Sequence, residues 1–241
     1  MKQSLTFIAL RSTPISDKKS VLNAYSLQAG RVAFVVSGGA SREAVRRRAI
    51  LQPLCIAEGV ASGRNGGELL TLSQISAVRP MPGLFGNPVK NAVALFVTEL
   101  LTVLLREGQP DPHLFNYIEM AIGRLANATT RQAANFHICF LLHLARIVGI
   151  EPDWETFAPG LALNLDEGLF CPASTVAPRM LSVDESAAAA RLSRITFDNM
   201  GWFRFSRQQR NRALDVILAY FSLHYAPLAS LRSLEVVRML F

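Results

Sequence analysis

The chain has 241 residues, half of them hydrophobic, so it can build one large domain or two small ones around a sizeable core. Its formal net charge of +7 is carried entirely by residues 1–80, which hold 11 basic and 4 acidic side chains against 14 of each kind in residues 81–241. This asymmetry favours an acidic partner for the N-terminal part, with nucleic acid ahead of an anionic membrane.

The apolar runs and the cysteines argue against a secreted protein, a membrane-spanning protein and a zinc or disulfide framework. The run Phe7–Leu10 is shorter than a signal peptide needs, and Ala92–Leu105 falls short of the roughly 20 apolar residues of a membrane span. Cys55, Cys139 and Cys171 lie far apart and form no CxxC motif, so we expect neither a zinc site nor a disulfide framework. We therefore expect a cytoplasmic protein that does not enter a membrane.

We predict five strands in the N-terminal part, separated by polar or glycine-rich turns. They cover residues 4–12, Val21–Leu27, Arg31–Val36, Ile50–Val60 and Glu68–Val78. Gln28, Ala29 and Gly30 between the second and third strands are typical of a hairpin whose glycine takes a positive φ. Pro53 in the fourth strand indicates an edge or a bulge. Five short strands with glycine turns in about 80 residues are typical of a small barrel of the OB type.

A basic segment follows the predicted hairpin. Gly38 and Gly39 let the backbone turn, and we expect a loop after them that carries four arginines, namely Arg42, Arg46, Arg47 and Arg48. A second loop, at residues 61–67, carries Arg64. A two-stranded ribbon beside guanidinium groups suits a polyanion. The alternative is a surface hairpin whose charges only keep the protein in solution.

The strand pattern stops at residues 79–83, where two prolines precede a glycine, and we predict a domain boundary at residue 80. Helical periodicity then continues through residues 81–241, which gives an α+β protein. Five helix starts are indicated by Asn87-Pro88, Asp111-Pro112, Thr129 with Gln132, Ser182 with Glu185, and Ser206 with Gln209. The segment Phe136–Arg146 is apolar on nearly all sides, so we expect it at the centre of a bundle, in a helix that ends at Gly149.

An irregular insert interrupts the helical pattern at about residues 151–181, which contain four prolines and a small hairpin around Asp166-Glu167-Gly168. A last short helix follows Leu231 and ends at Phe241.

Motifs for catalysis are missing from the sequence. It holds no GxxxxGK[ST], GxGxxG after a strand, HExxH or GxSxG pattern. His137 and His143 lie six residues apart on one predicted helix and face away from one another, so they cannot share a metal ion. We expect these histidines in a core or an interface, and we expect no enzyme and no cofactor.

Basic and aromatic side chains of the barrel are the candidate DNA contacts. Those for phosphates are Lys18, Lys19, Arg31, Arg42, Arg46, Arg47, Arg48 and Arg64. Tyr25 and Phe34 are candidates for stacking on bases, with the alternative that hairpin aromatics face the barrel core. The helical domain carries a second basic set, Arg124, Arg131, Arg146, Arg204, Arg207, Arg210 and Arg212, which suits an acidic peptide with a hydrophobic end or, alternatively, pairs with the acids of the same domain.

The whole chain resembles the RecO family of bacterial recombination mediators. The order of an OB-like domain, a linker and a helical domain with an irregular insert is similar. So are four stretches: Leu27–Arg31 with Ser37–Arg42, Leu51–Pro53, Phe136–Gly149 followed by Glu151-Pro152, and Leu231–Phe241.

The resemblance implies a mediator that binds single- and double-stranded DNA and anneals complementary strands. It implies partnership with RecR and with the acidic C-terminal tail of single-stranded-DNA-binding protein (SSB), and loading of RecA onto gapped DNA. Some members of the family carry a four-cysteine zinc module in the insert, whereas here only Cys171 lies in it, so we expect no zinc. By position, Arg124, Arg131 and Arg146 are the candidates for binding the SSB tail.

Two other functions stay open at this point. In the first, the protein is an interaction scaffold that uses its helical bundle, and the basic barrel is incidental. In the second, the protein is an enzyme acting on nucleic acid, although the sequence shows no carboxylate cluster for the metal ion that such chemistry uses.

Overall fold

The computed structural model of the chain describes residues 2–63, 69–79, 82–105, 109–173, 179–228 and 231–240. Its backbone forms two compact units, Met1–Asn127 and Ala128–Phe241. The first unit contains the barrel and the helices that follow it up to Asn127, so it extends beyond the domain boundary expected at residue 80. That boundary stays a prediction.

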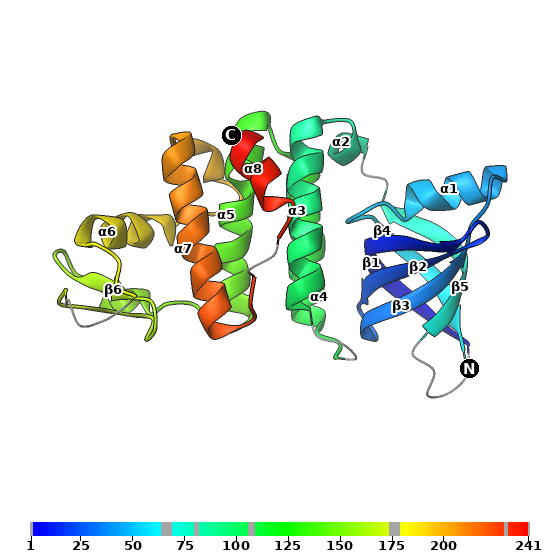
Figure 1. Ribbon diagram of the computed structural model, residues 1–241, viewed down its shortest axis with the longest axis horizontal. Coiled ribbons are helices and arrows are strands. Elements are labelled where there is room, and N and C mark those ends of the chain that lie inside the picture. The colour runs from blue at the N-terminus through cyan, green and yellow to red at the C-terminus, as the bar shows by residue number, and fades with distance from the viewer. Residues whose placement is uncertain are drawn as a thin grey trace. The chain divides into compact units, whose positions relative to one another are not determined.

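Five strands form a closed barrel in the first unit (Figure 1). They are β1 (Lys2–Ser16), β2 (Lys19–Ser26), β3 (Gly30–Ser37), β4 (Ile56–Ser62) and β5 (Leu69–Arg79). The order around the barrel is β1-β2-β3-β5-β4, and β4 closes onto β1. All neighbours are antiparallel except β3 and β5, which are parallel. Five strands in a closed barrel, with a helix between the third and fourth, confirm the predicted barrel.

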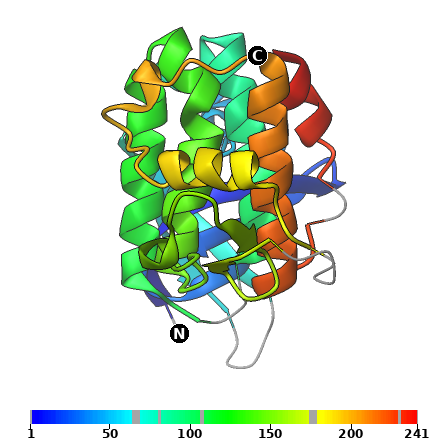
Figure 2. The same ribbon diagram turned by 90° about the vertical axis from the view of Figure 1, so that its left-hand side faces the viewer.

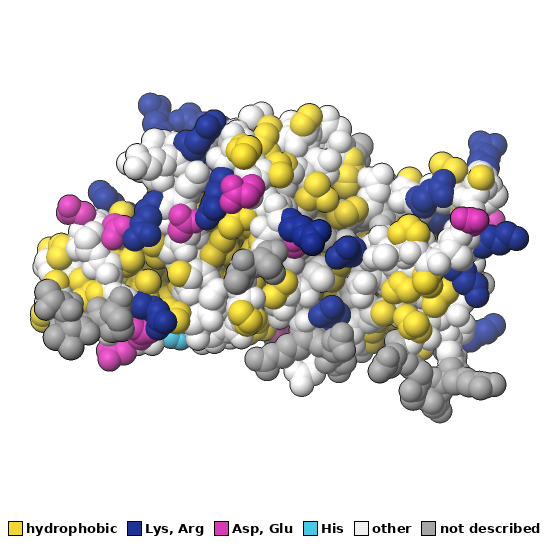
Figure 3. All heavy atoms as spheres, viewed as in Figure 1, with side chains coloured by type: hydrophobic (Ala, Val, Ile, Leu, Met, Phe, Trp, Pro, Cys, Tyr) yellow, Lys and Arg dark blue, Asp and Glu magenta, His cyan; other side chains and the backbone are white. Residues whose placement is uncertain are grey.

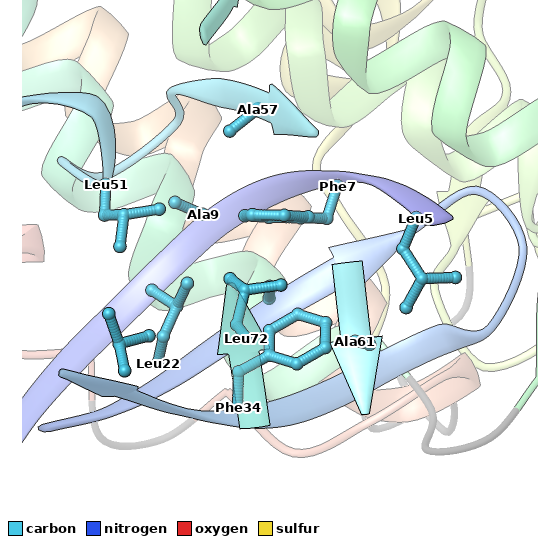
Figure 4. Close-up of a cluster of buried hydrophobic side chains, with 11 residues drawn as sticks. Leu5, Phe7, Ala9, Leu22, Phe34, Leu51, Ala57, Ala61 and Leu72 are labelled. Carbon is cyan, nitrogen blue, oxygen red and sulfur yellow. The ribbon is translucent and has the colours of Figure 1, made fainter. Parts of the chain in front are cut away.

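Alternating side chains of the strands fill the barrel (Figure 4). Successive residues of a strand point to opposite faces, so one residue in two enters the core. In β1 these residues are Leu5, Phe7 and Ala9, and the Phe7 ring lies 5.3 Å from the ring of Phe34 in β3. Leu51, which follows the helix between β3 and β4, adds its side chain to the same core.

The predicted hairpin joins β2 to β3, and Gly30 is the residue that the fold requires there. Gly30 has a φ of +67°, where side chains other than hydrogen are strained. A Cβ atom at this position would also lie 2.5 Å from the backbone of Gln109. The hairpin is therefore confirmed, and its glycine also allows a second segment of the unit to approach closely.

The expected basic loop after the hairpin is wrong: Arg42–Ile50 form the helix α1. Ser41 caps it, because its Oγ accepts a hydrogen bond from the N–H of Ala44 at 3.2 Å. Glu43 lies in the first turn and Arg47 and Arg48 in the last, which suits the helix dipole. The helix is short and has no long apolar stripe, so periodicity alone did not reveal it.

The fourth strand is shorter than the predicted Ile50–Val60. It begins at Ile56, and residues 51–55 form a turn that contains Pro53. Leu54 has a φ of +63° in this turn, and its N–H donates to the carbonyl of Ala9 at 2.8 Å. Pro53 therefore belongs to a turn and not to a strand edge or bulge.

Three helices complete the first unit: α2 (Pro82–Phe85), α3 (Pro88–Leu104) and α4 (Pro112–Asn127). The starts of α3 and α4 were both predicted from an Asx-Pro pair. Asn87 Oδ1 accepts from the N–H groups of Val89 and Lys90 at 3.0 and 3.2 Å, and Asp111 Oδ1 accepts from Leu114 N–H at 3.0 Å. Both starts are confirmed.

The second unit is mostly helical. Its elements are α5 (Thr130–Ile147), the 3₁₀ turns η1 (Trp154–Thr156) and η2 (Met200–Trp202), the short strands β6 (Ala162–Asn164) and β7 (Leu169–Cys171), α6 (Val183–Leu192), α7 (Arg207–His224) and α8 (Leu234–Leu240). The capping boxes predicted at Thr129, Ser182 and Ser206 are all present. The predicted hairpin of the insert is the pair β6–β7.

Helix α5 carries the largest share of the buried side chains in this unit, as its apolar sequence predicted. Helix α6 runs across the direction of α5 and α7 (Figure 2). Within the described residues, no helix is long and apolar enough to cross a membrane, and no three His, Cys, Asp or Glu side chains are placed to hold a metal ion.

Candidate nucleic-acid interface

Helix α1 turns one side to the barrel and leaves two arginines in solvent. Ala44 is buried, and Leu51 just beyond the helix enters the barrel core. Arg42 and Arg46 are exposed and lie one turn apart, on the same side of the helix. Among the described residues, neither has a carboxylate within salt-bridge distance. Their charges are therefore available to an anion.

The other two arginines of α1 are held by the protein. Arg47 Nη1 lies 2.7 Å from Glu43 Oε1 in an ion pair one turn apart. Arg48 Nη1 donates to the carbonyl oxygen of Gly39 at 2.8 Å. A carbonyl orients a guanidinium group but does not neutralise it, so Arg48 keeps its charge whereas Arg47 is compensated.

The turn between β1 and β2 lies against the segment that leads into α1. The N–H of Gly38 donates to the carbonyl of Lys18 at 2.8 Å, and Lys19 pairs with Ser37 across β2 and β3. Pairing of β2 with β3 thus places the β1–β2 turn beside the segment that leads into α1. The five cations of this turn and of α1 form a set that we call the basic end of the barrel. Its members are Lys18, Lys19, Arg42, Arg46 and Arg48. Figure 3 shows dark blue side chains over the α1 part of the barrel.

The outer face of β1, β2 and β3 adds a cation that the sequence analysis missed. Arg11 pairs with Asn23, and Asn23 pairs with Ala33, so the three side chains share one face of the sheet. Arg11 is exposed. In barrels of the OB type this face and the adjoining β1–β2 loop bind oligonucleotides. The signal in the sequence was a charged residue directly after the apolar stretch TFIAL.

The aromatic candidates Tyr25 and Phe34 are interior residues. Tyr25 is 2% exposed, its hydroxyl donates to the carbonyl of Asp111 at 3.4 Å, and its ring lies 6.1 Å from that of Phe115. Phe34 is fully buried in the barrel core. The structure does not support stacking of either ring on a base, because neither ring has an exposed face.

The side chain of Arg31 binds within the first unit and is not a free cation of the barrel surface. Its Nη1 donates to the carbonyl of Leu105 at 3.5 Å, just beyond the C-terminus of α3, where a helix dipole favours a cation. The side chain is half-buried, unlike those of the basic end. Arg64, the remaining barrel candidate, lies outside the described residues.

Two of the three candidates for the SSB tail lie far apart on one helix. Arg124 lies in α4 of the first unit, whereas Arg131 and Arg146 lie near opposite ends of α5. Their separation of 15 residues corresponds to about 22 Å along a helix. Arg146 is also engaged, because its Nε and Nη2 donate to the Glu151 carboxylate at 2.8 and 2.6 Å. This ion pair lowers the pKa of Glu151.

A hollow lies instead between α6 and α7, with a volume of about 590 Å³, and we call it the α6–α7 groove. Apolar side chains from α5, α6, α7 and the insert dominate its lining, among them Leu142, Leu163, Leu192, Phe205, Val216 and Ile217. Arg191, Arg204 and Arg212 also line it, and Arg212 Nε lies 2.6 Å from Glu185 Oε1. Figure 3 shows hydrophobic side chains between basic ones over this part of the unit.

These observations define a class: a closed five-stranded barrel with uncompensated cations at one end, followed in the chain by a helical unit with an apolar groove. The family model described as recombination protein O N terminal matches residues 1–81, and the one described as recombination protein O C terminal matches residues 86–235. The chain therefore belongs to the RecO family of DNA repair and recombination proteins, which are mediators and not enzymes. The resemblance that the sequence analysis identified is confirmed.

Curated relatives of the same description match along nearly the whole chain. The DNA repair protein RecO of Phocaeicola vulgatus is 29% identical over 241 residues, which is all of both chains. Those of Azobacteroides pseudotrichonymphae and Porphyromonas gingivalis are 24% and 28% identical over 234 and 238 residues, which is 97% of each chain.

Proposed function

We propose that this member of the RecO family is a DNA-binding recombination mediator. It binds single- and double-stranded DNA, anneals complementary strands, and helps to load RecA onto SSB-coated gaps together with RecR. With DNA as its substrate, it acts in the cytoplasm at the nucleoid. The observation that carries this proposal is the set of five exposed cations at the basic end of the barrel, none of which forms an ion pair with a carboxylate of the described residues.

The basic end acts by neutralising phosphates. Each phosphate contact releases condensed counterions, so five contacts predict a log–log salt slope of about −3.5 on single strands. Annealing follows from the same charge, because two strands held against cations repel one another less than they do in water. Arg48 is oriented by Gly39, which reduces the entropy lost when a phosphate binds.

The α6–α7 groove is the place that we propose for the SSB tail. An acidic peptide with an apolar end needs a concave apolar site beside cations, and the groove offers an apolar lining with Arg191 and Arg204, whereas Arg212 is paired with Glu185. The grouping of Arg124, Arg131 and Arg146 offers neither a shared position nor three available charges. RecR and RecA stay as partners without a proposed surface.

Fluorescence anisotropy of a labelled single strand at several salt concentrations tests the DNA proposal. The double variant R42A/R46A removes two exposed cations, so its salt slope should become shallower by about 1.4, with weaker binding at low salt. The control R191A/R194A removes two exposed arginines at the end of α6 and in the turn after it, in the second unit. Equal slopes for the wild type and R42A/R46A would show that the basic end is not the DNA site.

A labelled SSB tail peptide tests the groove in the same instrument. Ala188 lines the groove, so A188W should fill it and abolish peptide binding. Ala187 is the neighbouring residue on α6 and does not line the groove, so A187W is the matched control. Peptide binding without any DNA binding would support the scaffold alternative. Cleavage of DNA in Mg²⁺ that EDTA stops would revive the enzyme alternative.

A further inference from the structure

The second unit exposes one tryptophan. Trp202, at the end of the 3₁₀ turn η2, is 81% exposed, more than any other large hydrophobic residue in the described ranges. Tryptophan is enriched at binding interfaces, because it combines a large apolar ring with a polar N–H, so this exposed indole is a candidate contact residue. The site around Trp202 does not include the basic end of the barrel, and it shares Arg204 with the lining of the α6–α7 groove.

The backbone around Trp202 is held by buried polar side chains. Asn135 in α5 donates from Nδ2 to the carbonyls of Met200 and Phe203 at 2.8 and 2.9 Å. Arg210 in α7 donates from Nε to Oδ1 of Asn135 at 3.1 Å and from Nη2 to the carbonyl of Phe205 at 3.2 Å. A buried network of this kind fixes one geometry, so the ring of Trp202 is presented on a preorganised support.

The segment after Trp202 alternates in exposure. Phe203 and Phe205 are half-buried, and their rings stack with centroids 5.8 Å apart. Arg204 between them is exposed, as is Trp202. Alternation of this kind leaves an aromatic ring and a guanidinium group in solvent, two residues apart on an anchored backbone.

A further arginine lies close to this segment. A Cβ atom added to Gly201 would lie 3.0 Å from Cγ of Gln132, so the turn contacts the first turn of α5. Arg131, next to Gln132, is exposed at this helix start, where the dipole disfavours a cation. An anion bound there would remove that conflict.

The shape of the site distinguishes between two kinds of partner. A peptide anchors an apolar side chain in a concave site, but Trp202 protrudes and does not line the α6–α7 groove. A projecting flat ring beside arginines suits an unpaired base with phosphates on either side. We propose that Trp202, Arg131 and Arg204 form a second contact for single-stranded nucleic acid, in which the indole stacks on a base and the guanidinium groups bind adjacent phosphates.

This inference rests on the proposed DNA-binding function and adds to it. With the basic end of the barrel on the first unit, a contact on the second gives one chain two places for nucleic acid. Bases inside a duplex are covered on both faces by their neighbours, so the second contact selects single strands, whereas the basic end binds any phosphate backbone.

Intrinsic fluorescence gives a direct test. The chain has two tryptophans, so the variant W154F leaves Trp202 as the only reporter. Titration with an oligo(dT) strand should quench this fluorescence, and titration with a blunt duplex should not. Quenching by an SSB tail peptide without quenching by oligo(dT) would overturn the proposal in favour of a protein partner.

Affinity measurements on the otherwise unchanged chain provide the second arm. W202A should weaken oligo(dT) binding by about 5- to 160-fold and leave duplex binding and the salt slope unchanged, with W202F between W202A and the wild type. R131A/R204A should make the slope on single strands shallower by about 1.4. If the wild type binds oligo(dT) but W202A binds it equally well, this inference fails and the DNA-binding function stands. If the wild type binds no DNA, the proposed function itself fails.

Discussion

Arg210 donates from Nε to Oδ1 of Asn135 at 3.1 Å, and both side chains are buried in the second unit. Together they donate hydrogen bonds to the carbonyls of Met200, Phe203 and Phe205. This pair explains how the chain can hold η2 and the irregular segment between η2 and α7 in one conformation, with the exposed Trp202 at the end of η2.

The first prediction concerns the removal of this support. N135A should lower the free energy of unfolding by about 3 kcal/mol, because it leaves the carbonyls of Met200 and Phe203 without their donor and Nε of the buried Arg210 without its acceptor. Urea denaturation measures the loss. The control N127A removes an exposed amide that donates to the Gly123 carbonyl in α4, and it should cost less than about 0.5 kcal/mol. Equal losses in both variants would mean that the buried network stabilises the fold no more than an exposed hydrogen bond does.

The second prediction concerns acid stability. The pKa of His137 is lowered to about 3, first by burial and second by the positive charge of Arg210. Since the ordinary histidine pKa is about 6.5, the unfolded chain takes up the proton first as the pH falls. Stability from neutral His137 is therefore complete above pH 6.5 and is lost below it, by up to about 1.4 kcal/mol per pH unit.

Unfolding in urea at pH 7 and at pH 5 tests this, with H137F as the comparison. The wild type should lose more stability over this interval than H137F, which has no group to protonate at that position. A parallel decline of the two proteins would show that His137 does not set the acid sensitivity.

Much of the architecture followed from local rules. Capping boxes at Thr129, Ser182 and Ser206 predicted three helix starts, because a cap involves residues only three positions apart. Helix α1 also follows local rules, since Ser41 is its N-cap, an acidic residue lies in its first turn and two arginines lie in its last turn. It was missed because a short polar helix lacks the apolar period that was used to find the others.

The candidate site depended on distant contacts, and these are not written in any local pattern. The hairpin pattern allowed Tyr25 either to stack on a base or to face the core, and in the structure its hydroxyl donates to the carbonyl of Asp111, 86 positions away. Arg31 likewise meets Leu105, 74 positions away. The basic end, in contrast, follows from the β2–β3 hairpin, which places Lys18 against Gly38. Sequence reasoning could therefore name the charged residues but could not sort those in solvent from those inside the fold.

The third prediction concerns Gly30. G30A should lower the free energy of unfolding by at least about 2 kcal/mol, because a side chain is strained at a φ of +67° and its Cβ would lie 2.5 Å from the Gln109 backbone. Thermal or urea unfolding measures the effect. The control G123A lies in α4 with open space around the added Cβ, so it should stabilise the protein by about 0.5–1 kcal/mol. A neutral G30A would contradict the close approach seen here.

The fourth prediction concerns the compensated arginine of α1. Glu43 neutralises Arg47 at a distance of 2.7 Å, so E43Q should release a further cation for phosphates at the basic end. Single-stranded DNA should then bind more tightly at low salt, and the log–log salt slope should steepen by about 0.7. Anisotropy titrations at several salt concentrations measure both quantities.

The matched control for E43Q is E155Q, which removes an exposed carboxylate in η1 of the second unit and should leave the slope unchanged. The two variants change the net charge equally, so a difference between them reports position and not total charge. If E43Q binds DNA with the wild-type slope, Arg47 does not face the phosphates, and α1 presents to DNA only the side that carries Arg42 and Arg46. If both variants steepen the slope alike, DNA binding depends on the net charge of the chain, and the basic end is not shown to be the binding site.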